Sequence, residues 1–212
     1  MKNHRYILLL FAFLFGTASL SCSEKKLGEK VKVIECNPDV FIGKIDSKLN
    51  ETSGLIWFDN RLWSMNDGGN KDEVYALDAD GDIRITAELD DAKNMDWEAM
   101  TQDDKYIYVG DFGNNYGTRK DLKVYRFSKK KLRDDKKEVK IKAKKIKFSY
   151  ALQNNFFPKN HSHECDCEAM FSYEDHLYLF SKDWKSFETE VYKLPKQPGE
   201  YVLRPDAFFD VK

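Results

Sequence analysis

Hydrophobic and polar residues alternate in short runs along the chain from residue 31 onwards. Alternation with a period of two is typical of β-strands that bury one face, and few stretches after residue 27 show the longer period of a helix. Turn-forming pairs such as Asp59-Asn60, Asp80-Gly81 and Pro198-Gly199 separate the runs. Aromatic residues, 14% of the sequence, also favour strands. The pattern therefore predicts an all-β fold.

The hydrophobic runs recur in the same order three times. The segment Asp96 to Met100 is repeated at Asp166 to Met170, and a third copy begins at Glu51. In each copy a glutamate is followed by a hydrophobic–aromatic pair and then by a Val-Tyr pair. These pairs are Leu62-Trp63 and Val74-Tyr75, Ile107-Tyr108 and Val124-Tyr125, and Leu177-Tyr178 and Val191-Tyr192. Each repeat therefore predicts three consecutive strands, which we name A, B and C.

A fourth hydrophobic run, named D, follows each repeat, at Ile83 to Leu89, Val139 to Phe148 and Tyr201 to Phe209. Four antiparallel strands in a repeat of this length are typical of a β-propeller blade. We therefore expect a β-propeller of four-stranded antiparallel blades over residues 31–212, with blades that begin near residues 51, 98 and 168. A β-sandwich is the alternative, because it also uses many short strands.

The expected propeller is incomplete, since it has about three blades and closed propellers typically have four to eight. A strand within residues 31–45, either Val31 to Cys36 or Val40 to Ile45, is expected to be the outer strand that closes a ring. Two explanations stay open for the other blades. The chain is the first half of a six-bladed propeller, or two copies pair as a homodimer that completes the ring.

Residues 1–21 have the organisation of a bacterial signal peptide. Two basic residues precede an apolar run from Tyr6 to Phe15, which is too short to span a membrane because a spanning helix needs about 20 residues. Small residues then lead to Cys22, an arrangement that resembles a lipobox. We expect lipidation of Cys22 and a polar tether over residues 22–30. The alternative is an ordinary signal peptide that is cleaved nearby.

This reading places the protein in the bacterial cell envelope, held in a membrane through its N-terminal lipid. We expect the outer membrane, on its periplasmic side or at the cell surface. The net charge of −1 provides no global field that would attract nucleic acid, so nucleic acid is not an expected partner. An exported chain could oxidise two of the cysteines Cys36, Cys165 and Cys167, although free buried thiols are equally compatible with the sequence.

Acidic residues mark the start of each strand A, and acidic or amide residues mark the end of the first two strands B. In a propeller, strand A lines the central axis, and its start lies beside the end of strand B because neighbouring strands are antiparallel. These side chains are therefore expected to converge at the mouth of the axial channel, where a hard cation such as Ca²⁺ would neutralise them. The predicted metal ligands are Glu51, Glu98, Glu168, Asp96, Asp111 and Asn66.

Two alternatives remain for these residues. The carboxylates could hold a cation or a ligand, or they could accept hydrogen bonds from backbone N–H groups of neighbouring blades and so stabilise the repeat. No GxSxG, Walker or HExxH motif is present, and no catalytic residue can be named.

Four motifs carry a resemblance to known proteins: Glu-x-Ser-Gly-Leu from Glu51, Asn-Asp-Gly-Gly from Asn66, Asp-Trp-Glu-Ala-Met from Asp96 and Gly-Asp-Phe-Gly-Asn-Asn from Gly110. Over residues 49–212 they resemble a group of largely uncharacterised secreted bacterial β-propeller lipoproteins. More distantly, the sequence is similar to calcium-dependent six-bladed propellers of the gluconolactonase and regucalcin type. The distant resemblance implies a metal-bound glutamate at the channel mouth, and Glu51 is the matching position.

We therefore expect a cell-envelope lipoprotein that binds a small molecule, a glycan or a protein on its carboxylate-rich face, together with Ca²⁺. A metal-dependent hydrolase of lactones or phosphoesters is the first alternative, and a structural adhesion module is the second. Two further motifs favour simpler interpretations. The stretch His161 to Cys167 contains zinc-binding residue types, but Cys167 stands where Trp97 does in the repeat and so fits a packed core. The basic stretch Lys129 to Lys147 fits a charged edge strand or a contact with an anionic glycan.

The anchor can be tested by one substitution. Cys22→Ser removes the acceptor thiol, so acylation should be lost and the protein should leave the membrane fraction. Detergent phase separation measures this partitioning, and Cys36→Ser is a suitable control. Unchanged partitioning of the Cys22→Ser protein would contradict the lipoprotein assignment.

Overall fold

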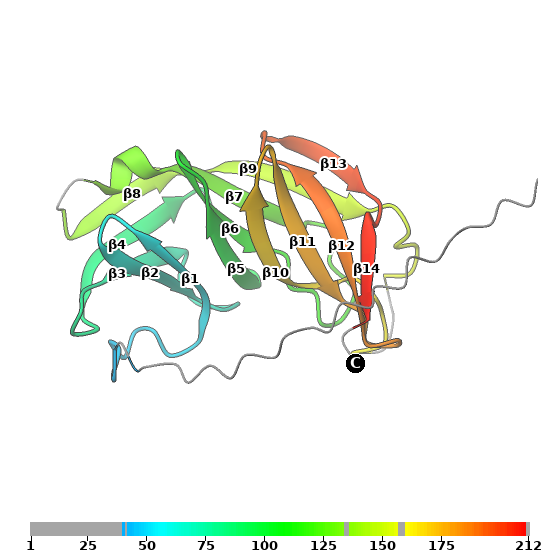
Figure 1. The fold of residues 1–212 in the computed structure, drawn as a ribbon, viewed down its shortest axis with the longest axis horizontal. Helices are drawn as coiled ribbons and strands as arrows, with labels where there is room; N and C mark the ends of the chain where they lie inside the picture. The colour runs from blue at the N-terminus through cyan, green and yellow to red at the C-terminus, as the bar shows by residue number, and fades with distance from the viewer. Residues whose placement is uncertain (1–39, 41, 134–135, 157–159, 211–212) are drawn as a thin grey trace, which may run out of the picture. The chain divides into compact units, whose positions relative to one another are not determined.

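A computed structural model of the chain describes residues 40, 42–133, 136–156 and 160–210. Cys22, the tether and the expected strand Val31 to Cys36 lie outside the described residues. Within the described part the fold is all-β, with strands in three sheets and one short 3-10 helix, η1 (Lys129–Leu132) (Figure 1). The described residues include no helix with the length and hydropathy needed to cross a bilayer.

Each sheet begins with three antiparallel strands that are consecutive in the sequence. The first sheet has the order β1 (Thr52–Phe58), β2 (Arg61–Asn66), β3 (Glu73–Leu77), β4 (Ile83–Asp90) and β8 (Glu138–Lys142). The second has the order β5 (Trp97–Gln102), β6 (Tyr106–Asp111), β7 (Lys123–Ser128), β9 (Lys144–Tyr150) and β13 (Gly199–Leu203). The third has the order β10 (Asp166–Tyr173), β11 (His176–Lys182), β12 (Glu188–Pro195) and β14 (Ala207–Asp210).

The predicted strands A, B and C are confirmed in all three repeats, and so is the first strand D, which is β4. The predicted turn at Asp59-Asn60 is confirmed as well. Both residues have φ of 54° and form the two-residue loop between β1 and β2. Positive φ at both central positions matches the type I′ turn that suits the twist of a hairpin.

The second and third strands D are wrong as single strands, because each run divides between two sheets. The run Val139 to Phe148 breaks at Ala143 into β8 and β9, and β8 pairs in parallel with β4 of the first sheet. The run Tyr201 to Phe209 likewise divides into β13, parallel to β9 of the second sheet, and β14 in the third. The chain thus adds a strand to the outer edge of the preceding sheet before it completes its own sheet.

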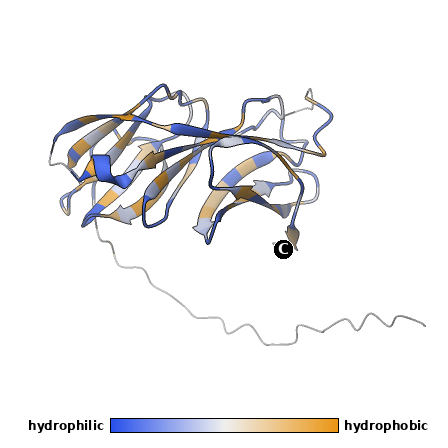
Figure 2. Cartoon of the chain, turned by 90° about the horizontal axis from the view of Figure 1, so that it is seen from above, coloured by the Kyte–Doolittle hydropathy of each residue, from blue (hydrophilic) through white to orange (hydrophobic). Residues whose placement is uncertain are grey.

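The second sheet is packed between the other two, and its two faces contribute to different hydrophobic cores. Successive apolar residues such as Ile107 and Tyr108 enter opposite cores, as burial of both faces requires. Figure 2 shows hydrophobic residues interspersed with hydrophilic ones along the strands of the fold. The core shared with the first sheet includes Trp63, Met65, Ile85, Trp97, Ile107 and Tyr125. The core shared with the third sheet includes Tyr108, Phe112, Phe148, Cys167, Leu179 and Tyr192. Three sheets in face-to-face contact differ from the two sheets of a β-sandwich.

The innermost strands β1, β5 and β10 are neighbours in the order of the sheets, with β5 in contact with both others. The described residues do not close a ring of sheets. The second candidate for a ring-closing strand, Val40 to Ile45, forms no strand in its described residues. Instead Ile45 packs beside Leu49 and Leu77 on the first sheet, and the Asp46 N–H donates to the Gly81 carbonyl at 2.9 Å.

The crossing strand β8 should contribute to the stability of the first sheet. Ile141 on β8 is 2% exposed within the core between the first and second sheets. Ile141→Ala is therefore expected to lower the free energy of unfolding by about 2–4 kcal/mol. Urea denaturation measures this loss, and Lys142→Ala, at an exposed neighbour on the same strand, should change it by less than about 0.5 kcal/mol. Equal effects of the two substitutions would show that β8 does not pack as described.

Candidate functional site

A β-bulge recurs near the start of the innermost strand of each sheet. In β5 the pairing with β6 passes from Trp97 to Ala99, and in β10 the pairing with β11 passes from Cys167 to Ala169, so Glu98 and Glu168 are the extra residues. In β1 the extra residue is Ser53. A bulge redirects a side chain from the regular alternation of the strand. Each sheet therefore presents one extra polar residue at the same place.

The register corrects the predicted equivalence of the three glutamates. Ser53, and not Glu51, occupies the position of Glu98 and Glu168. Glu51 instead corresponds to Asp96 and Asp166, two residues before the bulge. The Glu51 side chain is exposed, and its Oε2 accepts a hydrogen bond from Asn70 Nδ2 at 2.8 Å.

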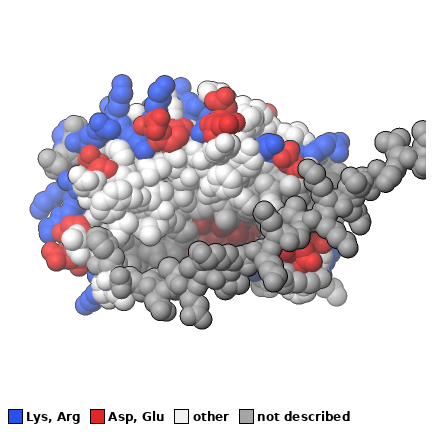
Figure 3. Space-filling model, viewed as in Figure 1, with Lys and Arg blue, Asp and Glu red and all other residues white. Residues whose placement is uncertain are grey.

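Three carboxylates from two sheets meet at this end of the strands. One oxygen from each of Asp67, Asp96 and Glu98 lies within 4.8 Å of the others, and these residues are the one such group of potential metal ligands in the described part of the chain. Asp67 follows β2, whereas Asp96 and Glu98 flank the start of β5. Figure 3 shows acidic side chains in a hollow beside the starts of β5 and β10. The predicted convergence of strand starts and strand ends is thus present.

Two glycines allow the backbone to approach this group closely. A Cβ at Gly68 would lie 2.7 Å from Asp96 Oδ1, and a Cβ at Gly113 would lie 2.5 Å from the carboxylate carbon of Asp96 and nearer still to Glu98 Oε1. Both distances are shorter than real side chains tolerate. The carboxylates therefore occupy space that a side chain at Gly68 or Gly113 would fill.

Asp111 and Asn66, two of the predicted ligands, form hydrogen bonds or ion pairs within the protein. Asp111 is 0% exposed, and its Oδ1 accepts from the Asp96 N–H at 3.1 Å and from Arg119 at 2.9 Å. Its Oδ2 lies 3.0 Å from Lys123 Nζ. Asn66 accepts from the Glu51 N–H and donates to the Lys48 carbonyl. Asn66 and Asp111 Oδ1 thus have protein hydrogen-bond partners, whereas Asp111 Oδ2 is buried without a hydrogen-bond partner and faces the Lys123 ammonium group.

Polar side chains also join one sheet to the next. Asn94 donates to the carbonyls of Asn66 and Asp67 at 3.1 and 2.8 Å, which connects the start of the second sheet to the first. Asp166 accepts from the Asn114 N–H and from Trp184 Nε1, each at 2.8 Å, which connects the third sheet to the second. The alternative expectation of carboxylates that bond neighbouring backbone N–H groups is therefore correct for Asp166.

The carboxylates of the cluster repel one another, and the one backbone hydrogen bond to them among the described residues is that from the Gly68 N–H to Asp67 Oδ1, at 2.5 Å. Burial, followed by the charges of Asp67 and Glu168, raises the pKa of Glu98 to about 8. Burial and the charge of Asp67 raise the pKa of Asp96 to about 6, although Arg119 opposes this shift. Glu168 lies at the exposed rim, and partial desolvation together with Asp166 raises its pKa as well. In the described residues no Lys or Arg forms an ion pair with Asp67, Asp96 or Glu98.

Sequence reasoning missed Asp67 as a ligand, although it belongs to the run at the end of β2. The informative signal is its position, one residue beyond the last strand residue and beside Gly68. The packed-core reading of Cys167 is confirmed. It occupies the place of Trp97 in the register, both residues are 0% exposed, and Cys165 and Cys167 are free thiols.

Comparison of the sequence with protein-family models and with curated proteins finds no match. The resemblance to secreted β-propellers therefore stays a prediction from the motifs. The assignment of the candidate site is based on the geometry of Asp67, Asp96 and Glu98.

The raised pKa values predict how stability depends on pH when no metal is bound. Because the pKa of Glu98 is higher in the folded state than its ordinary value of 4.5, the folded state binds more protons between that value and about 8. Stability should therefore fall as pH rises through this window. Urea titrations in chelator from pH 5.5 to 8.5 should show this decline, and it should be smaller in Glu98→Gln.

Glu88→Gln is the matched control, because the Glu88 side chain on β4 is 45% exposed and lies outside the cluster. It should retain the decline of the native chain. An identical pH dependence in the native chain and in Glu98→Gln would contradict the placement of Glu98.

Proposed function

We propose that this chain forms part of a β-propeller in the bacterial cell envelope and binds a ligand through a hard divalent cation, Ca²⁺ in the first instance. The observation that carries this proposal is the group of three carboxylates, Asp67, Asp96 and Glu98, with oxygens within 4.8 Å of one another and no ion-pair partner in the described residues. The ligand is a small molecule, a glycan or a protein segment with oxygen donors of its own.

The propeller architecture is supported by the way the three sheets are assembled. Sheets with consecutive antiparallel strands pack face to face, and their first strands lie next to one another. In propellers the first strands surround an axis, and the loops that end the second strands meet at one end of it. The bulges at Glu98 and Glu168 are equivalent features of two such sheets.

The chemistry of the donors favours a hard cation. The group contains carboxylates and no His or Cys, whereas zinc and softer metals prefer nitrogen and sulfur ligands. Arg119 and Lys123 both pair with Asp111 and Asp121, and Lys182 acts on Glu168 at the rim. A bound cation would therefore supply the ion-pair partner that Asp67, Asp96 and Glu98 lack among the described residues.

Asp67, Asp96 and Glu98 would hold the cation, and Glu168 at the rim would face a ligand or bound water. Ca²⁺ takes six to eight oxygens, more than three carboxylates provide when each binds through one oxygen. Positions on the cation would then remain for the hydroxyl, carboxylate or carbonyl oxygens of a ligand. An acyl anchor on Cys22 would keep this recognition at a membrane surface.

Cation binding is tested by titration of the metal-free chain at pH 7.5. Ca²⁺ should raise the unfolding midpoint, with a gain of about 2.7 kcal/mol when its concentration is one hundred times the dissociation constant. Glu98→Gln should weaken binding at least tenfold, because it removes a charge from the cluster. Gly113→Ala should also weaken it, since the added Cβ would displace Asp96 and Glu98.

The matched controls are Glu88→Gln for charge and Gly43→Ala for the added methyl, because a Cβ at Gly43 would meet nothing within 4 Å. Both should bind Ca²⁺ as the native chain does. Absence of a calcium-dependent shift, together with no metal in the native protein by mass spectrometry, would overturn the proposal. Esterase and lactonase assays of the calcium-loaded chain then distinguish a binding protein from a hydrolase.

A further inference from the structure

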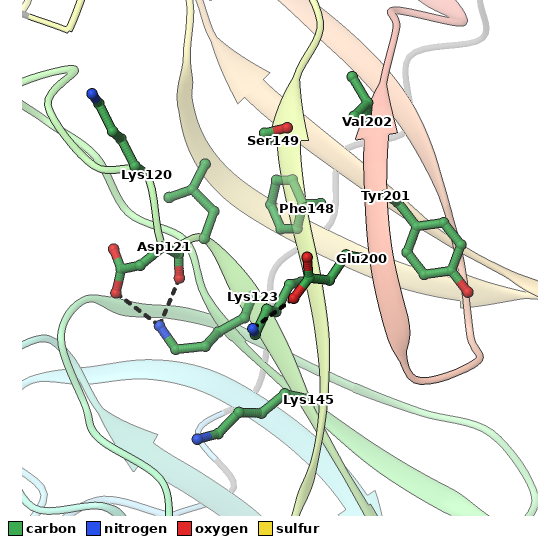
Figure 4. Close-up of a pocket in the computed structure, with 11 residues that line it drawn as sticks. Lys120, Asp121, Lys123, Lys145, Phe148, Ser149, Glu200, Tyr201 and Val202 are labelled. Carbon is green, nitrogen blue, oxygen red and sulfur yellow. Dashed lines mark hydrogen bonds and ion pairs between the residues drawn. The ribbon is translucent and has the colours of Figure 1, made fainter.

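A second concave site lies on the second sheet, on the side that carries lysines. It is a groove of about 530 Å³ formed by residues of β7, β9 and β13 and by the segment before β7 (Figure 4). This volume is within the range of about 300–1,000 Å³ that is usual for small-ligand sites. The carboxylates of the candidate cation site do not line it.

The groove carries an excess of positive charge. Four lysines line it, Lys120, Lys123, Lys145 and Lys147, against two carboxylates, Asp121 and Glu200. Lys123 and Lys147 pair with these carboxylates at 2.9 and 2.7 Å. The remaining two lysines have no ion pair among the described residues. An anionic ligand would therefore meet two ammonium groups whose charge is not already balanced.

The two unbalanced lysines extend over aromatic rings. Lys120 Nζ lies 4.5 Å from the ring centroid of Phe156, and Lys145 Nζ lies 5.9 Å from that of Tyr125. Such contacts orient a cation but leave its N–H groups available as donors. In Figure 4, Lys123 and Lys145 extend to the same side of β9, whereas Lys120 lies on the other side of Asp121 and extends away from it. The cationic groups are therefore distributed along the groove.

The rest of the lining is uncharged. Ser149 on β9 supplies a hydroxyl, and Val202 on β13, which is 71% exposed, supplies an aliphatic surface on the far side from Lys120 (Figure 4). Lys142 and Lys144, which precede the groove residue Lys145 in the sequence, are also exposed. Figure 3 shows Lys and Arg side chains gathered along the edge of the molecule that carries β8.

We propose that this groove binds an anionic oligosaccharide, a chain of sugars with carboxylate or sulfate groups. The lysines would bind its acidic groups, Ser149 its hydroxyls, and Val202 an apolar face of a sugar ring. A single inorganic anion would fill only a small part of about 530 Å³. A flat membrane surface would not reach Lys123, which is 9% exposed at the base of the lysine group. A concave, partly cationic site fits a flexible acidic chain better than either.

The oligosaccharide site can be tested without a change to the proposed cation site if Lys123 is left in place, because Lys123 pairs both with Asp121 in the groove and with buried Asp111. Lys120 and Lys145 have no such role, so their removal leaves the partners of Asp111 in place. They are exposed and outside the hydrophobic cores, and their substitution should not impair folding.

Binding is measured with tetragalacturonate, an oligomer of carboxylated sugars, by titration calorimetry in chelator so that no metal bridges the ligand. The neutral tetramer of galactose is the control ligand. The native chain should bind the acidic oligomer with an affinity that falls as salt increases. The double variant Lys120→Ala with Lys145→Ala should bind at least tenfold more weakly, with an unchanged unfolding midpoint.

The control protein carries Lys48→Ala with Lys71→Ala. It removes the same charge from exposed positions outside the groove, and Lys48 also lies over a tyrosine ring, at 5.7 Å from Tyr75. It should bind as the native chain does. Equal weakening of the two double variants, equal affinity for the neutral tetramer, or no binding of tetragalacturonate would overturn the proposal. Lysine-dependent binding to phosphatidylglycerol vesicles but not to the oligosaccharide would overturn it in favour of a membrane contact.

Discussion

The structure depends on the need of the second sheet to bury both of its faces. Its strands carry large apolar side chains on each side, with Trp97 and Tyr125 toward the first sheet and Tyr108 and Phe148 toward the third. A sheet of this kind is stable only between two others, because either face left in water would forfeit about 25 cal/mol for each Å² of apolar surface. The three sheets therefore assemble as a stack and not as separate hairpins.

This stacking also creates the acidic site. With β1, β5 and β10 held side by side, the loop after each second strand meets the start of the next sheet. Some of the polar groups that meet there satisfy one another, as Asp166 and Asn114 do, whereas Asp67, Asp96 and Glu98 are brought together without a balancing charge. The packing of the two cores compensates for the burial and mutual repulsion of these carboxylates, which raise the pKa values of Asp96 and Glu98.

Much of this arrangement was predictable from the alternation of residues. Strands A to C and the convergence of their ends follow from periodicity and antiparallel pairing, and β4 followed in the same way. The division of Val139 to Phe148 was not predictable, because a strand has the same period whichever sheet it joins, and only Ala143 marks the break. The place of Glu51 was hidden for a different reason. Two acidic residues, two positions apart, mark the start of β5 and of β10, and in β1 the second of these positions is Ser53, so Glu51 resembled Glu98 in sequence although it corresponds to Asp96.

Because strands β8 and β13 cross to the preceding sheet, a sheet of the folded protein does not coincide with one repeat of the sequence. The repeat that begins at β5 contains the outermost strand of the sheet before it and receives its own outermost strand from the repeat after it. A duplicated repeat would thus add its own new sheet and would also add a strand to the outer edge of the sheet before it. Growth of such a protein by added repeats is therefore directional, since each new repeat at the C-terminal side completes the sheet of its predecessor.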